Sequence, residues 1–159
     1  MEIGVPMSLQ SSYGTLTFND LEDGAGLGLP DGNGYLVQAI AGGVYPVIRN
    51  PVDNRPNRSG GIVHPFWKGA KIITLSGLVV ASLPIHRTTL DDHLRGVTNA
   101  LLEVAGTYRW TPPLAAQRSH AVRLLSGVEI LGQSGSGGMN AAPKQFTIEL
   151  VAEDSTEGA

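Results

Sequence analysis

One stretch of the chain has the periodicity of a helix, and the other patterned stretches have the character of strands. Its apolar residues are spaced alternately by four and three positions: Leu90, Leu94, Val97, Leu101 and Val104. That spacing places them on one face of an α-helix. Thr89 is suited to cap the start, with Asp92 three residues later, and Gly106 is suited to the end. We therefore expect one amphipathic helix over residues 89–105.

Strand-like patterns lie on both sides of this helix. The clearest are alternating or β-branched runs at residues 14–20, 70–82, 120–133 and 144–153. Two further strands, at 35–42 and 44–49, are separated by Gly42 and Gly43, which predicts a hairpin turn between them. Strands as long as 70–82 and 120–133 have edges that need a partner, and we expect neighbouring subunits to supply it.

The composition agrees with many strands joined by turns. The chain has 159 residues, the length of one domain, with 21 glycines, 10 prolines and only 16% charged residues. We expect a single mainly β domain over 1–159, a β-sandwich or open barrel of the tail-tube type named below, with one flanking helix. Residues 1–14 are weakly patterned and are expected to form a flexible arm, and residues 155–159 a polar tail.

Charge and cysteine content exclude several classes of protein. The net charge of −3 argues against binding DNA along the surface, which usually needs a positive excess. The absence of cysteine excludes disulfides, thiolate metal sites and a cysteine nucleophile. The longest apolar run, residues 72–83, is too short to insert into a membrane. The first ten residues lack the basic and apolar regions of a signal peptide.

No motif for catalysis or for a cofactor stands out. The glycine-rich "GAGLGL" at residues 24–29 leads into "PDGNG" rather than into a helix, so it does not match a dinucleotide loop. The four histidines, His64, His86, His93 and His120, have no metal-ligand spacing. No serine sits in a GxSxG elbow. We therefore expect no enzyme, no cofactor and no metal.

The stretch "IRNPVDNRPNRSGG", residues 48–61, invites two interpretations. Its arginines, Arg49, Arg55 and Arg58, are suited to grip a phosphate backbone or to make bidentate contacts with carboxylates of a protein. The stretch has no aromatic residue for base stacking, and the chain is acidic, so the protein interface is favoured. Nearby Phe66 and Trp67 are either core residues or anchors of the same interface.

Several segments together resemble the N-terminal domain of siphophage distal tail proteins. The arginine-bearing strand and long loop are followed by "KGAKIITLSGLVV", which is similar to the family pattern GRxIxLxGxI with Lys71 where arginine is common. The helix "TTLDDHLRGVTNALLEVAG" and the ending "VRLLSGVEILGQSGSGGMNAAPKQFTIELVAED" resemble the family's helix and closing strands. The resemblance covers residues 35–154.

This resemblance implies a structural protein of the virion, made in the cytoplasm of the bacterial host. Such a protein forms a homohexameric ring at the distal end of the tail tube. One face of the ring joins the tail tube protein and the other the tail hub or tip protein. Tape measure protein and then DNA pass through the lumen, which an acidic to neutral chain suits. Arg49, Arg55, Arg58, Phe66 and Trp67 are then expected at subunit contacts.

Other functions remain open from the sequence. A tail tube subunit and a tail terminator fit the same resemblance. A carbohydrate-binding β-sandwich is the alternative from another class, and it is expected to expose several aromatic residues on one face. The chain has only nine aromatic residues, two Trp, four Tyr and three Phe, which favours the tail protein.

Overall fold

The computed structural model describes the chain over residues 2–42, 48–49, 52–54, 61–63, 67–68, 70–131 and 144–152. In chain order its elements are β1 Glu2–Gln10, β2 Thr15–Asp20, α1 Asp23–Gly26, β3 Gly34–Gly42, β4 Ile48–Arg49, β5 Val52–Asn54, β6 Gly61–Val63, β7 Trp67–Lys68, β8 Lys71–Val80, α2 Pro84–Ala100, β9 Gly106–Trp110, β10 Arg118–Leu131 and β11 Lys144–Ala152. The predicted class, mainly β with a flanking helix, is confirmed.

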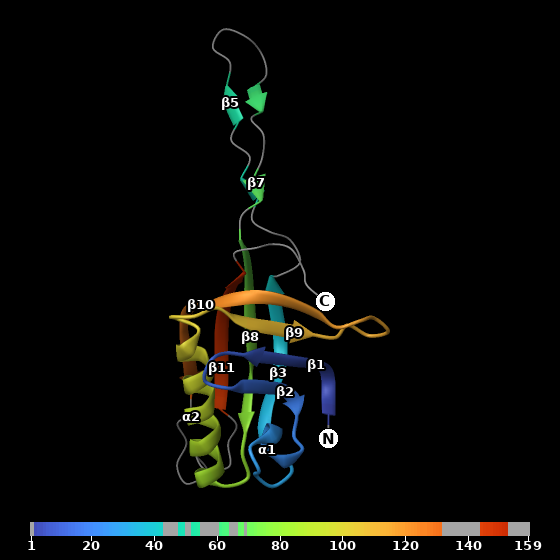
Figure 1. Ribbon diagram of the computed structural model, residues 1–159, viewed down its shortest axis with the longest axis vertical. Helices are drawn as coiled ribbons and strands as arrows, with labels where there is room; N and C mark the ends of the chain where they lie inside the picture. Colours follow the sequence, from blue (N-terminus) through green and yellow to red (C-terminus); the bar gives the residue numbers. More distant parts are fainter. Residues whose placement is uncertain are drawn as a thin grey trace.

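Seven strands form a closed barrel in the order β1–β2–β3–β8–β11–β10–β9 (Figure 1). Neighbouring strands are antiparallel except β2 and β3, which are parallel and pair only around Tyr35. The sequence left a sandwich and an open barrel as alternatives. The barrel is closed rather than open because β1 pairs with β2 on one side and with β9 on the other.

Alternate residues of the strands fill the barrel interior. In β11, for example, Phe146, Ile148 and Leu150 are buried, while the residues between them are partly exposed. Three aromatic rings, Phe18, Tyr35 and Phe146, pack against one another with centroids 6.1 to 6.4 Å apart. Burial of each large apolar side chain contributes about 1.5–3 kcal/mol. The barrel is therefore a well-packed base for the segments that project from it.

Helix α2 begins and ends earlier than the sequence pattern predicts. It starts at Pro84, because proline at the first helical position has a suitable φ and needs no N–H partner. Thr89 lies inside the helix rather than at its cap, and its hydroxyl donates to the carbonyl of Ile85 at 3.1 Å. The helix ends at Ala100. Val104, the last member of the predicted stripe, therefore lies beyond the helix and is exposed.

The rest of the predicted apolar stripe packs on the barrel. Leu90, Leu94 and Val97 are fully buried. The hydroxyl of Tyr35 in β3 donates to the carbonyl of Leu90. Nζ of Lys144 in β11 lies 3.1 Å from Oδ2 of Asp91. These polar contacts fix the position of the helix along the barrel.

Gly96 has a packing role inside α2. Glycine in a helix costs about 1 kcal/mol relative to alanine. A Cβ at this position would lie 2.5 Å from the ring of Tyr13, which belongs to the turn between β1 and β2. Close by, Nε2 of His93 in α2 donates to the carbonyl of Thr15, the first residue of β2, at 2.8 Å. The glycine thus lets the β1–β2 hairpin lie close against the helix.

Residues 1–14 were expected to be a flexible arm, but residues 2–10 form strand β1 of the barrel. Met7 and Leu9 are buried in the core. The register between β1 and β2 shifts between the pairs Glu2–Asp20 and Met7–Phe18. This irregularity breaks the alternation of apolar residues that identifies a strand in a sequence, which explains why the pattern looked weak.

Candidate interface surfaces

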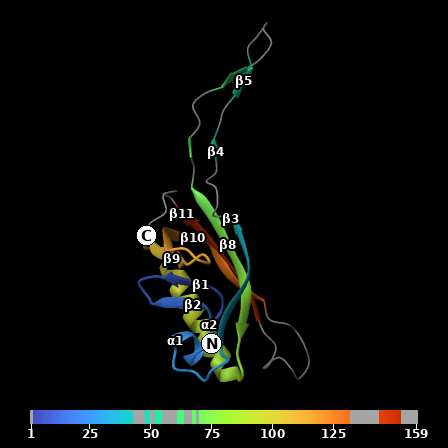
Figure 2. The ribbon, with the colours of Figure 1, turned by 90° about the vertical axis from the view of Figure 1, so that its right-hand side faces the viewer.

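Strands β3 and β8 are continued by a two-stranded β-arm formed by β4, β5, β6 and β7. β4 pairs with β7, and β5 pairs with β6. In each pair of opposite residues, from the barrel to the far end of the arm, the two residue numbers have nearly the same sum, between 114 and 116. This constant sum is expected for one continuous antiparallel hairpin. Figures 1 and 2 both show these strands beyond the end of the barrel. The predicted long inter-strand loop thus contains paired strands.

The hairpin predicted between residues 35–42 and 44–49 is wrong, because β3 pairs with β8 and β4 pairs with β7. Residues 43–47 themselves lie outside the described residues. The partner of β3 is therefore a strand about 30 residues further along the chain, since Gly42 is opposite Ile73. A turn signal such as Gly42-Gly43 predicts local pairing and cannot indicate pairing over this separation.

The β-arm contains two of the five predicted interface residues in its described strands. The backbones of Arg49 in β4 and Trp67 in β7 are directly opposite each other. Arg55 and Arg58 fall between β5 and β6 in the sequence, and Phe66 falls just before β7; all three lie outside the described residues. The interface role of these five residues stays a prediction.

The free strand edge is not where the sequence placed it. The long strands at 70–82 and 120–133 were expected to need partners from other subunits. In the structure β8 lies between β3 and β11. β10 pairs with β11 on one side and, over residues 118–122, with β9 on the other. The barrel itself supplies these partners, a long-range pairing that no local pattern reveals.

The outer edge of β3 is one of the strand edges that have no partner among the described residues. Beyond Val37, no strand among the described residues pairs with β3 on the side away from β8. Gln38, Ala39, Ile40, Ala41 and Gly42 are all exposed and uncharged. This edge lacks the lysine, proline or inward charge that usually protects an edge strand from pairing with another chain. It is a candidate interface by strand addition.

Asn19 marks the point where β2 and β3 separate. Its side-chain Nδ2 donates to the carbonyl of Val5 at 2.9 Å, and its Oδ1 accepts from the backbone N–H of Val37 at 3.0 Å. Asn19 has a φ of 61°, a left-handed conformation that asparagine tolerates better than most residues. One amide side chain therefore connects β1 and β3 where the ladder between β2 and β3 ends.

The glycine-rich segment is a tight turn and not a phosphate loop. Element α1 contains consecutive left-handed residues, with φ of 61° at Gly24 and 60° at Ala25. A Cβ at Gly24 would lie 2.3 Å from Cβ of Leu29, so this glycine permits the chain to fold back on itself. The segment leads into strand β3 rather than into a helix. It therefore has no helix N-terminus whose backbone N–H groups could bind a phosphate.

The histidines that the structure describes are separate from one another. His120 is buried on β10 and stacks on Trp110, with ring centroids 5.2 Å apart. His93 contacts the β1–β2 hairpin, as described above. Within the described ranges, no group of three or more His, Cys, Asp or Glu residues is placed to hold a metal ion. His64 lies outside those ranges.

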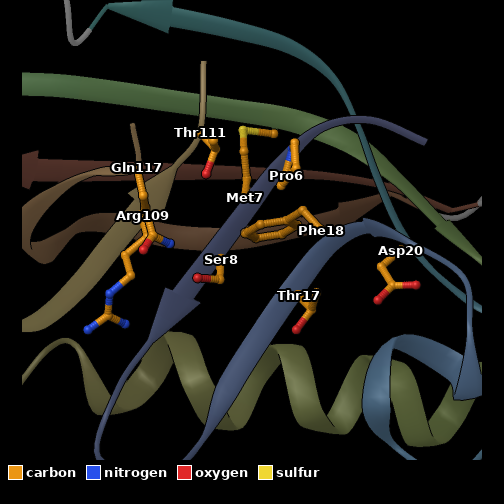
Figure 3. Close-up of a pocket in the computed structure, with 9 residues that line it drawn as sticks. All are labelled: Pro6, Met7, Ser8, Thr17, Phe18, Asp20, Arg109, Thr111 and Gln117. Atoms are coloured by element: carbon orange, nitrogen blue, oxygen red, sulfur yellow. The ribbon is translucent and has the colours of Figure 1, made fainter. Parts of the chain in front are cut away.

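A shallow hollow of about 160 Å³ lies over β1, β2 and the base of the β9–β10 hairpin (Figure 3). It is lined by Pro6, Met7, Ser8, Thr17, Phe18, Asp20, Arg109, Thr111 and Gln117. Asp20 and Arg109 lie at opposite ends of it. The hydroxyls of Ser8 and Thr17 have no histidine among the lining residues to activate them.

Two tyrosines have pKa values above the usual value for a tyrosine side chain. Burial raises the pKa of Tyr108 to about 12, and its hydroxyl faces Sδ of Met7 at 3.4 Å. Burial, with a smaller contribution from the negative charge of Asp91, raises the pKa of Tyr35 well above its usual value. Both phenols stay protonated at neutral pH and act as structural donors.

In the part of the chain that the structure describes, no helix has the length and apolar character needed to cross a membrane.

No family model and no curated protein matches the chain by sequence. Among solved structures, the chain is similar to the Dit protein of phage SPP1, whose structure is described as "a Paradigm of Hub Adsorption Apparatus in Gram-positive Infecting Phages". The TM-score is 0.62, the sequence identity is 13%, and the match covers 95% of this chain and 51% of that one. The chain thus spans about half the length of this structural neighbour. The likeness shows that the chain has the fold of the matched half of this neighbour.

Proposed function

We propose that this chain is a structural protein of a phage tail and that it assembles into a six-membered ring at the distal end of the tail tube. The observation that carries the proposal is the similarity of fold to SPP1 Dit over nearly the whole chain. The resemblance of the sequence to distal tail proteins is independent of that comparison and leads to the same role. The protein then resides in the virion.

The proposed partners follow from the position of the ring. One face binds the tail tube protein and the opposite face binds the tail hub or tip protein. Tape measure protein and DNA pass through the lumen without stable binding. The net charge of −3 supports transit, because a strongly basic lumen would retain DNA.

Two features of the fold supply the proposed subunit contacts. The exposed edge of β3 takes a strand from a neighbouring copy, which gives main-chain hydrogen bonds at the interface. The β-arm reaches beyond the barrel, and its arginines, Arg49, Arg55 and Arg58, bind carboxylates of the neighbouring subunit or ring. Phe66 and Trp67 contribute apolar contact area beside them.

A carbohydrate-binding module is less well supported. Such a module needs aromatic side chains on an open face. Among the residues whose burial the structure describes, Tyr13 is the only aromatic one that is exposed. A tail tube subunit or a terminator would share the ring and the fold, and its place on the tail would distinguish it.

Electron microscopy of the purified protein, together with light scattering over a range of concentrations, tests the proposal. We expect six-fold annuli with an open lumen and a mass of six chains. The variant Ile40→Lys places a charge on the β3 edge and should reduce assembly, whereas Thr74→Lys on the interior strand β8 serves as a matched control. A monomer at all concentrations, in the presence of the tail tube protein as well, would contradict the ring.

A further inference from the structure

The tip of the β9–β10 hairpin is apolar and projects from the barrel. Trp110 in β9 pairs with Arg118 in β10, so residues 111–117, with the sequence "TPPLAAQ", form the tip. The tip contains no charged residue. Figure 1 shows it extending to the side of the barrel, away from α2. At its base the backbone N–H of Thr111 donates to the carbonyl of Pro6 at 3.0 Å, which ties the hairpin to β1.

Leu114 at this tip is in a conformation and an environment that leucine does not favour. The N–H of Ala115 donates to the carbonyl of Pro112 at 3.2 Å and closes a four-residue turn. In this turn Pro113 occupies the second position and Leu114 the third, with a φ of 57°. A positive φ at the third position is normally met by glycine or asparagine. Leu114 is also 108% exposed.

The folded monomer gains nothing from this leucine. The side chain of Leu114 does not pack in the core. Glycine would adopt the same turn with less strain. A bulky apolar side chain held out on a tied hairpin has the geometry of an anchor that fills a pocket on a partner. The hairpin is rigid at its base and its two prolines restrict the turn, so little conformational freedom would be lost on binding.

The hollow over β1 and β2 has the character of a receptor for such an anchor. Pro6 is an exposed apolar residue of its lining, and the edges of Met7 and Phe18, which are 5% and 1% exposed and pair across the two strands, lie at its base. Ser8 and Thr17, also paired, supply polar groups around it. Its volume is about 160 Å³. An apolar cavity of about 150 Å³ holds a benzene-sized group, so the hollow has room for a leucine side chain.

We propose that Leu114 of one copy inserts into this hollow of a second copy, against Pro6 and between Ser8 and Thr17. The anchor and the hollow are different surfaces of the same chain, and the exposure of Leu114 shows that the chain's own hollow does not hold it. Each copy therefore offers one anchor and one hollow, which makes a heterologous contact that closes into a ring. This contact rests on the ring proposed above and specifies residues for it.

Disulfide crosslinking tests the contact directly, since the chain has no native cysteine. The variant Leu114→Cys with Ser8→Cys should give a ladder of covalent oligomers without reductant, and peptide mass spectrometry should find the link between positions 114 and 8. Leu114→Cys with Glu103→Cys, an exposed residue beyond the end of α2, is the control and should give no such ladder. Rings visible by electron microscopy without the 114–8 link would overturn this contact and leave the ring intact. Absence of both rings and crosslinks would overturn both proposals.

The variant Leu114→Gly separates an anchor from a structural residue. If Leu114 is an anchor, the apparent dissociation constant of assembly should rise by roughly tenfold or more, as loss of a buried leucine side chain predicts. The melting temperature of the monomer should be unchanged or higher, because glycine suits the positive φ. The control Leu102→Ala removes another exposed leucine, just beyond the end of α2, and should leave assembly unchanged. A lower melting temperature with unchanged assembly would show that Leu114 is structural and would refute the proposal.

Discussion

Two hairpins leave the barrel, and they differ in how they present side chains to a partner. The hairpin of β3 and β8 continues through the β-arm as paired strands, and its sequence between residues 48 and 61 carries three arginines. The β9–β10 hairpin ends in a short turn with no charge and one exposed leucine. The first is suited to a broad polar contact and the second to a single apolar contact. One subunit thus has two chemically distinct ways to hold its neighbours.

The largest expected effect comes from removing the β-arm. Replacing residues 43–69 with a short Asn-Gly turn should leave the barrel folded, because all seven strands of the barrel lie outside this segment. Assembly should fall below detection. Circular dichroism melting reports the fold, and light scattering reports assembly. If the shortened chain still forms rings, the arm does not hold neighbouring subunits and the β9–β10 hairpin carries the contact.

The strands that lead into the two hairpins each contain a glycine at which the backbone of another strand approaches closely. A Cβ at Gly77 in β8 would lie 1.9 Å from the carbonyl oxygen of Leu36, and a Cβ at Gly106 in β9 would lie 2.1 Å from that of Gln10. Gly77→Ala and Gly106→Ala should each lower the free energy of unfolding by about 1–3 kcal/mol, as overpacking does. Chemical denaturation measures this.

Gly26→Ala is the matched control for these glycine variants. Nothing lies within 4 Å of a Cβ at Gly26, and only its φ of 84° opposes a side chain. The control should cost about 1 kcal/mol, from backbone strain alone. Equal losses for all three variants would show that backbone conformation, rather than close approach, sets the cost at the hairpin bases.

An effect on assembly rather than on stability is expected from the arginines between β5 and β6 in the sequence. Arg55→Glu with Arg58→Glu should weaken assembly by about 1–3 kcal/mol if both arginines bind carboxylates, and Arg55→Lys with Arg58→Lys should weaken it less. Added salt should reduce the difference between the two variants. Sedimentation at several ionic strengths measures both effects. Unchanged assembly in the charge-reversed variant would leave the arm without its proposed electrostatic role.

The sequence predicts the parts of this fold that depend on local spacing. The stripe of Leu90, Leu94 and Val97 identifies the helix because each turn repeats the same apolar face. The start of the helix at Pro84 could also have been predicted from the sequence, since proline favours the first turn of a helix. The turn at "PPLAAQ" follows from its prolines. Leu114 could have been singled out there, since a leucine after two prolines is unusual at the position of a turn that prefers glycine.

The closure of the barrel could not be read from the sequence. Met7 pairs with Trp110 about 100 residues away, and no local pattern encodes that register. The strand β1 was missed because its pairing with β2 is interrupted after Glu2. The free edge of β3 depends on where β2 diverges, which is set by the side chain of Asn19 and not by the pattern of β3 itself.

The contact made by Asn19 also determines how the barrel moves. Every other seam between neighbouring strands of the barrel is an antiparallel ladder of several residue pairs. The seam between β2 and β3 consists of pairing around Tyr35 and of the hydrogen bond to the amide of Asn19. Local opening therefore begins at this seam, and the amide hydrogen of Val37 exchanges with solvent before those in the middle of β8. An incoming strand that pairs with β3 would suppress this opening, so ring formation would rigidify the subunit as well as join it to its neighbour.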